Sequence, residues 1–454
     1  MYEEKETLNK EFDTIDIILR PLNSFSLKYL LIVILLVIII AIGAFAWFFQ
    51  LDNGLGVTGL NERVFWGMYI SNFIFFIGIS YSGTLISAVL RLTQAEWRTP
   101  LTRMAEIITV VGILVGFSMI FIDLGKPDRI LFVPFSLRLQ SPLFWDFLSV
   151  STYLTGSAIF LYLPLIPDIA FLRDKFKNLP QETESSIKRF WFTFRGKLYS
   201  ILAMGWSGNE QQKRKLTRSI SIMTIILVPI AISCHTVIAF IFAMTWRVGW
   251  HSTIFGPYFV IAAIYSGIAA IIIAVGILRK VYHFEKIITY REFRNLGYLL
   301  FVFFLMYLYF TITEYFTSIY RGANDDVELV EALLLGAYAP HFWIFVIFGM
   351  VVPGILNLIA CMRYKKESSV WLLIIASLLV VGGMWLKRFI IVVPALARPF
   401  VEQTWTIYNP SPVEWAITIA ASAGFILFYS IFAKLFPLVS LWEMEEKGEK
   451  KETN

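Results

Sequence analysis

Residues 29–49 read YLLIVILLVIIIAIGAFAWFF, a run of 21 residues that contains no charged side chain. A helix needs about 20 mainly apolar residues to cross the hydrocarbon core of a bilayer. The run follows 28 residues rich in Glu and Lys, and no small-residue cleavage motif comes after it. We therefore interpret it as a retained transmembrane anchor and not as a cleaved signal peptide.

Similar apolar segments recur along the whole chain of 454 residues, which is 57% hydrophobic and only 16% charged. Soluble domains contain about 45–50% apolar and about 25% charged residues, so an ordinary cytoplasmic enzyme, a disordered protein and a secreted disulfide scaffold are excluded. We predict an all-α integral membrane protein with about ten transmembrane helices. The predicted spans are 29–49, 65–90, 101–122, 143–166, 219–245, 255–278, 297–319, 341–362, 369–390 and 413–438.

The basic residues predict the orientation of these spans. With ten spans, the two termini and the even-numbered loops share one side, which holds 29 Lys and Arg residues, against 9 on the other side. Basic residues favour the cytoplasmic side, so both termini are expected to be cytoplasmic. The loop 167–218 carries 11 of the 29. It serves either as an orientation determinant that contacts lipid headgroups or as a docking face for a soluble partner. The net charge of +6 does not indicate nucleic-acid binding, because the basic residues lie in loops.

A short internal match suggests how the spans are grouped. Tyr81-Ser82-Gly83 in the second span is followed by Arg91, and Tyr265-Ser266-Gly267 in the sixth span is followed by Arg279. Both spans run in the same direction, as in parallel repeats of membrane proteins. We expect a first four-helix bundle over 65–245 and a second over 255–390. The remaining parts are an N-terminal arm (1–28), the anchor (29–49), a last helix (413–438) and a cytoplasmic tail (439–454).

Ionisable residues at membrane depth are costly and therefore informative. Taken singly, each could be a helix-end side chain that reaches the interface. However, several spans carry such a group near the outer side, namely Asp123, Asp146, His235, Glu314 and the pair Lys387 and Arg388, while His251 and His341 lie beside them. Together they predict a polar pocket that opens toward the outer leaflet.

Carboxylates and imidazoles in such a pocket accept protons and hydrogen-bond a polar headgroup, so an amphiphile such as quinol would fit. Asp123, Asp146, His235 and Glu314 are the candidates for proton transfer. Trp145 and Trp250 flank the pocket and either line it or belong to the aromatic belt of the membrane. Nearer the inner side, Glu106 is expected to form a local ion pair with Arg103.

The number and positions of the cysteines and histidines restrict which cofactors this chain could bind. Cys234 and Cys361 lie inside apolar segments and cannot form a CxxC site, so we expect no iron–sulfur cluster and no metal in this chain. Two haems need four axial ligands, and the chain has four histidines, of which His251 and His283 lie in loops. Only His235 and His341 could act together as axial ligands within the membrane. A single bound haem is therefore still compatible with the sequence, although we expect none.

These motifs resemble the NrfD/polysulfide-reductase family of membrane subunits. Residues 123–127 (DLGKP) resemble its Asp-Leu-Gly-Arg-Pro motif, with Lys126 in place of Arg. Further segments resemble the ten-span quinol-oxidising branch found in alternative complex III, although that branch has His where this chain has Asp123. They are 82–88, 91–93, 97–98, 102–103, 145–146, 235–237, 249–255, 257–260, 266–267 and 290–292.

The resemblance implies two four-helix bundles in the cytoplasmic membrane of a prokaryote and a quinone site near the outer surface. It implies that Asp123, Asp146, His235, His251 and Glu314 serve in quinone binding and proton transfer, and that an iron–sulfur subunit lies on the outer face. We expect Asp146, His251 and His235 to bind the quinone, together with Trp145 and Trp250, which flank the predicted pocket. In the alternative complex III version, quinol electrons continue to c-type haem subunits and protons leave on the outer side. In a second version, the chain anchors a molybdopterin enzyme that reduces a sulfur compound such as polysulfide or thiosulfate. A secondary transporter is the alternative of another class.

Overall fold

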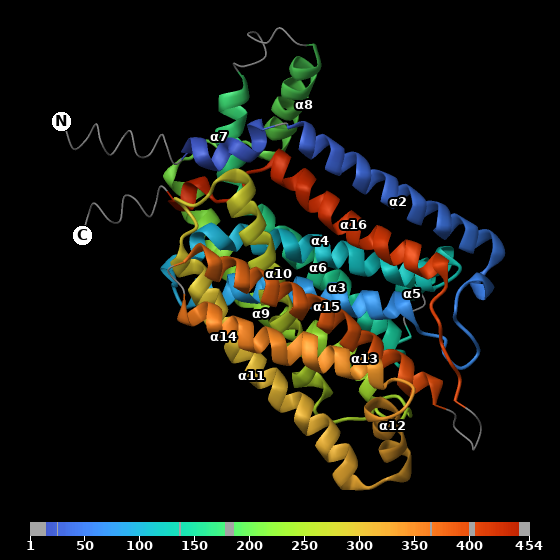
Figure 1. Ribbon diagram of the computed structural model, residues 1–454. Coiled ribbons are helices and arrows are strands. Elements are labelled where there is room, and N and C mark those ends of the chain that lie inside the picture. Colours follow the sequence, from blue (N-terminus) through green and yellow to red (C-terminus); the bar gives the residue numbers. More distant parts are fainter. Residues whose placement is uncertain are drawn as a thin grey trace.

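The computed structural model describes residues 15–24, 26–135, 138–177, 186–363, 366–398 and 405–444, and every regular element among them is helical. Residues 15–23 form a short helix whose Ile17, Ile18, Leu19 and Leu22 are buried. Much of the predicted N-terminal arm and C-terminal tail lies outside the described residues. The long helices run roughly parallel or antiparallel in one array (Figure 1).

Within the described part of the chain, nine helical segments are long and apolar enough to cross a membrane. The pair α6 (Pro142–Tyr162) and α7 (Leu165–Lys177), bent by 48°, brings the number to ten if it is counted as one span. The nine are α2 (Leu27–Asn53), α3 (Met68–Leu92), Glu96–Asp123 with α4 (Thr99–Asp123), α9 (Glu210–Ala243), α10 (Phe255–Tyr282), α11 (Tyr290–Arg321), Ala339–Met362, α15 (Glu367–Ala397) and α16 (Pro412–Leu435). Each predicted span overlaps one of these segments, so the predicted all-α membrane class is confirmed.

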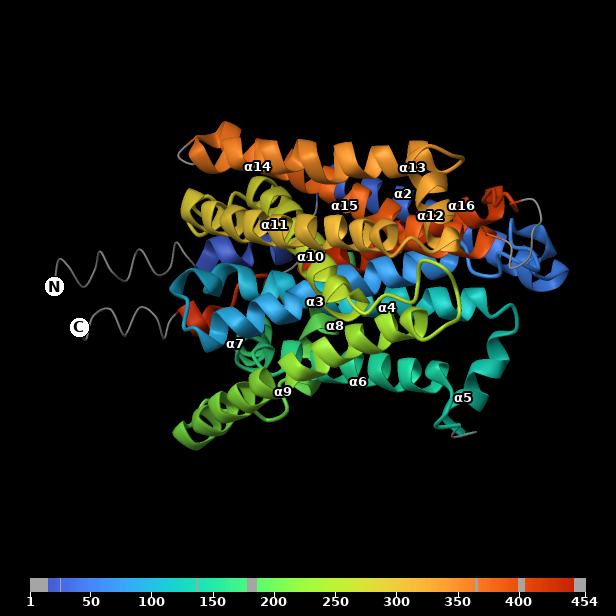
Figure 2. The same ribbon diagram turned by 90° about the horizontal axis from the view of Figure 1, so that it is seen from below.

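The helices pack in two groups of four. In the first group α3 packs on α4 and α9, and α6 packs on α4 and α9. In the second group α10 packs on α11 and α15, and the segment Ala339–Met362 packs on both α11 and α15. Contacts of α3 with α10 and α15 join the groups, while α2 and α16 lie side by side at one edge (Figures 1 and 2). We propose that each group is one of the four-helix units expected from the sequence.

The helix array has two ends. The described chain begins at Ile15 and finishes at Met444 near the same end, which we call the terminal face (Figure 2). The helices α7 and α8 (Ser186–Leu202) lie near this face, and α9 begins there. At the opposite end, the distal face, α12 (Asn324–Leu334) and α5 (Phe132–Phe135) cover the helix ends. Most of the ionisable residues of interest lie toward the distal face.

The segment Ala339–Met362 is not a uniform α-helix. Its first part, α13 (Ala339–Ile344), continues through a π-helical stretch at Phe345–Val351 into α14 (Val352–Met362). Gly349 in the π-helical stretch lies against Gly383 of α15. A π-helical turn locally changes the direction of side chains and often occurs at functional sites.

Candidate functional site

A cavity of about 210 Å³ opens at the distal face between α11, α12, α15 and the loop 249–253, and we call it the distal pocket. Its polar wall contains His251, Glu314, Arg321, Asp326 and Lys387. Two of these residues, His251 and Glu314, are site candidates from the sequence. The structure therefore brings them to one cavity although 62 residues separate them in the chain.

Lys387 and Glu314 form a buried ion pair on the inner wall of this pocket. The Lys387 ammonium donates to Glu314 Oε2 at 3.0 Å and to the Tyr315 hydroxyl at 2.8 Å. The side chains of Lys387 and Glu314 are 1% and 11% exposed. A buried charge needs a partner to offset its desolvation, and each of these two residues supplies that partner for the other.

His251 occupies the outer rim of the distal pocket. Its Nδ1 lies 2.8 Å from the Arg247 carbonyl oxygen, and its Nε2 lies 2.9 Å from a guanidinium nitrogen of Arg321. Arg321 also pairs with Asp326 at 2.5 Å. A guanidinium can only donate, so these contacts suit a neutral imidazole that carries its proton on Nδ1 and accepts at Nε2. These two contacts fix the orientation of the His251 ring at the rim of the pocket.

A second cluster lies at the interface of the two helix groups, and we call it the interface cluster. It consists of Tyr81 on α3, His235 on α9 and Arg388 on α15. The ring centroids of Tyr81 and His235 are 4.3 Å apart, and Arg388 lies near His235. The Arg388 guanidinium lies over the ring of Phe259, 5.2 Å from its centroid. All three members of the cluster are buried.

Each residue of the interface cluster has a polar atom without a hydrogen-bond partner among the described residues. These atoms are the Tyr81 hydroxyl, His235 Nδ1 and one terminal nitrogen of Arg388. Buried polar groups in folded proteins are nearly always hydrogen-bonded, so three neighbouring exceptions call for a ligand or ordered water. Between them they can both donate and accept hydrogen bonds.

Asp146 lies on the α6 side of this region. Its carboxylate is buried, lies near Cys234, and has one oxygen without a partner in the described chain. Cys234 directly precedes His235, so α9 connects Asp146 with the interface cluster. The neighbouring Trp145 is half exposed, and its indole donates to the Leu139 carbonyl at 2.8 Å.

The other two candidates lie apart from the distal pocket. Asp123 ends α4 and has one buried oxygen without a partner in the described chain. It lies near Tyr69, whose hydroxyl donates to Gln50. Trp250 is buried, donates to the Ile391 carbonyl at 2.7 Å and stacks on Trp66. Its contacts fix the loop that carries His251.

One expected contact is wrong. Arg103 pairs with Asp168 at 2.5 Å and not with Glu106, which instead accepts a hydrogen bond of 2.7 Å from Ser87. Asp168 lies on α7, and a contact across the bend between α6 and α7 could not be read from local helix spacing. In the part of the chain that the structure describes, no group of three or more His, Cys, Asp or Glu side chains could hold a metal ion.

The sequence pattern missed two residues of the distal pocket, Arg321 and Asp326. Arg321 is the last residue of α11 and Asp326 lies in the first turn of α12, both outside the predicted spans. The acidic pair Asp325-Asp326 so close after Arg321 is the one local signal that could have pointed to them.

Known proteins similar in sequence to this chain indicate its family. Residues 56–399 match the model of the family described as polysulphide reductase, NrfD. One relative is a candidate membrane subunit of dimethyl sulfoxide reductase from Halobacterium salinarum, 25% identical over 85% of this chain and 86% of its own. Another is a selenate reductase subunit from Mesobacillus selenatarsenatis, which is 26% identical over 87% and 91% respectively.

A third relative is the Hdr-like menaquinol oxidoreductase integral membrane subunit of Archaeoglobus fulgidus, 23% identical over 94% of this chain and 98% of its own. The relatives are therefore matched over nearly their full lengths. Because the family model matches well over half of the chain, the protein belongs to the polysulphide reductase NrfD family.

Proposed function

We propose that this chain is the quinone-reactive membrane subunit of a respiratory oxidoreductase complex in the cytoplasmic membrane of a prokaryote. It exchanges electrons between membrane quinol and an iron–sulfur subunit on the distal face, and it holds no haem or iron–sulfur cluster itself. The observation that carries the proposal is the interface cluster, with three buried polar atoms that lack a partner among the described residues. A relative named as a menaquinol oxidoreductase subunit supports the same substrate class.

The interface cluster has the chemistry that a quinone headgroup needs. A quinone presents carbonyl oxygens that accept hydrogen bonds, and a quinol presents hydroxyls that also donate. Arg388 can only donate, whereas Tyr81 and neutral His235 can donate or accept. In this proposal they bind the headgroup, and the half-exposed Trp145 beside Asp146 contacts the quinone ring.

In this proposal, different ionisable residues accept the quinol protons and conduct them to the distal face. Oxidation of quinol releases two electrons and two protons, so a general base must lie within hydrogen-bond reach of each hydroxyl. His235 and Asp146 are the proposed first acceptors. Glu314 and His251 are the proposed exit to the distal face through the distal pocket, and Asp123 is proposed to serve a second exit at the end of α4.

The test compares one substitution at two histidines. We expect His235→Asn to lower quinol oxidation by the purified complex about a hundredfold, the scale of a lost general base. His283→Asn, in an exposed turn on the terminal face, should leave the rate unchanged. Complex content is measured through the co-purified iron–sulfur subunit. Full activity of His235→Asn would contradict the proposed site, and loss of the complex in that variant would indicate a structural role.

Two partner sets fit the proposed function. In the alternative complex III version, electrons continue to c-type haem subunits. The molybdopterin version is favoured by a specific observation, because two relatives are named as subunits of dimethyl sulfoxide and selenate reductases.

Mass spectrometry of the complex purified from native membranes in mild detergent distinguishes the two sets. An iron–sulfur subunit with multihaem cytochromes supports the first, and one with a molybdopterin protein supports the second. A chain that purifies without redox partners and transports a solute unaided would contradict both and favour a secondary transporter.

A further inference from the structure

A second and larger cavity lies at the terminal face, away from the residues of the proposed quinone site. Its volume is about 730 Å³, and the first turns of α9 form one wall. The opposite wall comes from α7, from Trp206 before α9, and from Leu441 and Trp442 after α16. We call it the terminal cavity.

The α9 wall is polar and basic. The polar residues of α9 that face the cavity recur at helical spacing: Glu210, Lys213, Arg214, Thr217, Arg218 and Ser221. The apolar Leu216 lines the cavity beside them. A helix stripe that packs against a neighbouring element is normally apolar. The polar stripe here therefore indicates a surface that faces something other than protein.

The positive charge of this wall is largely uncompensated. Glu210 lies 3.8 Å from Lys213, but both side chains are well exposed, so this pair contributes little. Arg214 and Arg218 are exposed, and no ion pair involving either occurs in the described part of the chain. Two adjacent guanidinium groups are thus free to bind an anion, and guanidinium matches the geometry of phosphate oxygens.

The opposite wall is apolar and aromatic, with Phe171, Trp206, Leu441 and Trp442. Asp168 also lies there, but its charge is compensated by Arg103, and it accepts from the backbone N–H groups of Leu441 and Trp442 at 3.1 Å. A wall of this kind would be a poor surface for a free inorganic anion. It suits the glycerol and acyl region of a lipid.

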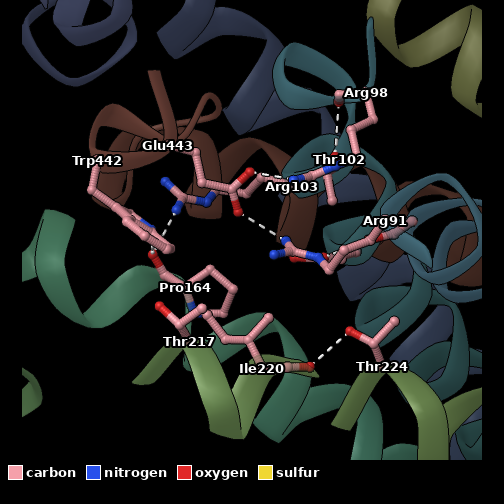
Figure 3. A network of polar contacts seen from close by, with 12 residues as sticks. Arg91, Arg98, Thr102, Arg103, Pro164, Thr217, Ile220, Thr224, Trp442 and Glu443 are labelled. Carbon is pink, nitrogen blue, oxygen red and sulfur yellow. Dashed lines mark hydrogen bonds and ion pairs between the residues drawn. The ribbon is translucent and has the colours of Figure 1, made fainter. Parts of the chain in front are cut away.

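A polar network holds the apolar wall in place (Figure 3). The Trp442 indole donates to the Pro164 carbonyl at 3.1 Å, and Glu443 accepts from Arg91 at 2.8 Å and from Arg98 at 3.0 Å. The segment after α16 is thereby fixed between α3, α4 and the bend after α6. The terminal cavity is therefore a formed site and not a gap between loose ends.

The start of the apolar run of α9 predicts that the cavity lies at the level of lipid headgroups. Thr217 and Ser221 stand where α9 passes from its basic first turns into the apolar run that follows residue 219. Basic pockets between membrane helices at this level bind anionic headgroups. We propose that the terminal cavity binds an anionic phospholipid, whose phosphate contacts Arg214 and Arg218 and whose acyl region packs on Trp206 and Trp442.

The test measures phospholipid retention by native mass spectrometry on the full chain purified with its complex. Phosphatidylglycerol should be retained and phosphatidylcholine should not. The double variant Arg214→Gln/Arg218→Gln should bind phosphatidylglycerol about thirtyfold more weakly, because each basic side chain near an anionic surface contributes a factor of about five. Lys197→Gln/Lys215→Gln is the matched control, since both lysines are exposed on the same face and neither lines the cavity.

A third variant separates shape from charge. Thr217→Trp fills the cavity without changing its charge, and it should also reduce phosphatidylglycerol retention. Equal losses in the two double variants would overturn the proposal in favour of diffuse surface charge. Full displacement of phosphatidylglycerol by an equal concentration of inorganic phosphate would overturn it in favour of a free-anion site. Retention by Thr217→Trp at the level of the unmodified chain would place the lipid elsewhere.

Discussion

Lys387 and Arg388 are neighbouring buried cations of α15, and different contacts stabilise their charges. Lys387 has its partner inside the protein, since Glu314 and Tyr315 accept from its ammonium group. Arg388 lies over the ring of Phe259 and has a terminal nitrogen without a partner among the described residues. An aromatic face offsets only part of the desolvation of a cation. For this reason Arg388, and not Lys387, is the residue that we assign to a ligand.

The energetic coupling between Lys387 and Glu314 can be measured by comparing the stabilities of two single variants and the double variant. Lys387→Met leaves the Glu314 carboxylate buried without its cation, which typically costs about 3–5 kcal/mol. We therefore expect a large fall in the thermal stability of the detergent-solubilised protein. Adding Glu314→Gln should restore most of the loss, because the pair is then removed together. The double variant should still release protons slowly during quinol oxidation. Additive losses of stability would contradict the pairing.

Glu443 on the terminal face gives a prediction about pH. Burial raises the pKa of a carboxyl group, but Arg91 and Arg98 outweigh burial here and hold the pKa of Glu443 below its usual value. A lowered folded-state pKa means that the stabilisation is complete above the unfolded-state pKa of about 4.3 and is lost as pH falls through the folded-state value.

The measurement is a melting temperature as a function of pH. Glu443→Gln should melt below the unmodified protein by a constant interval at neutral pH, and this interval should shrink once the pH falls below about 4. Glu62→Gln, an exposed glutamate of the distal face, is the control and should change little at any pH. An interval that does not change with pH would mean that Glu443 acts through packing alone.

Among the helices, the contact between the π-helical stretch Phe345–Val351 and α15 depends on two glycines. A Cβ atom added at Gly383 would lie 2.2 Å from the Gly349 Cα, and one added at Gly349 would lie 2.8 Å from the Gly383 Cα. Small residues allow membrane helices to approach this closely. Gly383 lies one turn before Lys387, so the same contact positions the wall of the distal pocket.

The two adjacent glycines of α15 provide a matched pair of variants. Gly383→Ala should separate the helices, lower the melting temperature and reduce quinol oxidation through displacement of Lys387. Gly382→Ala places its methyl group where no atom lies within 4 Å, and it should be neutral or slightly stabilising because alanine favours helix. Equal behaviour of the two variants would show that the close contact has no consequence.

Across the molecule as a whole, basic residues gather toward the terminal face, whereas the proposed quinone chemistry lies toward the distal face. The predicted topology places the terminal face in the cytoplasm. Cysteine labelling in intact cells tests it. A membrane-impermeant maleimide should label Glu62→Cys on the distal face without lysis, and it should label Lys215→Cys only after lysis. Both positions are exposed, and the native Cys234 and Cys361 are buried. The reverse pattern would invert the orientation and the direction of proton release.

Hydropathy was sufficient to predict the spans. Each predicted segment overlaps a helix or a bent helix pair, because a membrane helix satisfies its own backbone hydrogen bonds and its apolar length is fixed by the bilayer. Helix ends were less well predicted. The helix α9 begins at Glu210, well before the predicted start at residue 219, because a basic amphipathic turn extends the helix beyond the apolar run.

The candidate site was predicted only in part. An ionisable residue at membrane depth is energetically costly and therefore unusual, and on this ground the sequence analysis selected Asp123, Asp146, His235, His251 and Glu314 as candidates. It could not assign their partners. Lys387 of α15 meets Glu314 of α11, Arg103 of α4 meets Asp168 of α7, and the last residue of α11, Arg321, reaches the distal pocket.

The membrane class, the number and approximate limits of the spans, and several of the ionisable residues at membrane depth therefore follow from the sequence alone. These properties depend on the composition of single segments. The folded chain was needed to show that these residues divide between a distal pocket and an interface cluster, and that a basic cavity is formed at the terminal face. The direction and rotation of the neighbouring helix determine which side chain an ionisable residue contacts. Both follow from packing contacts between segments that are distant in the chain.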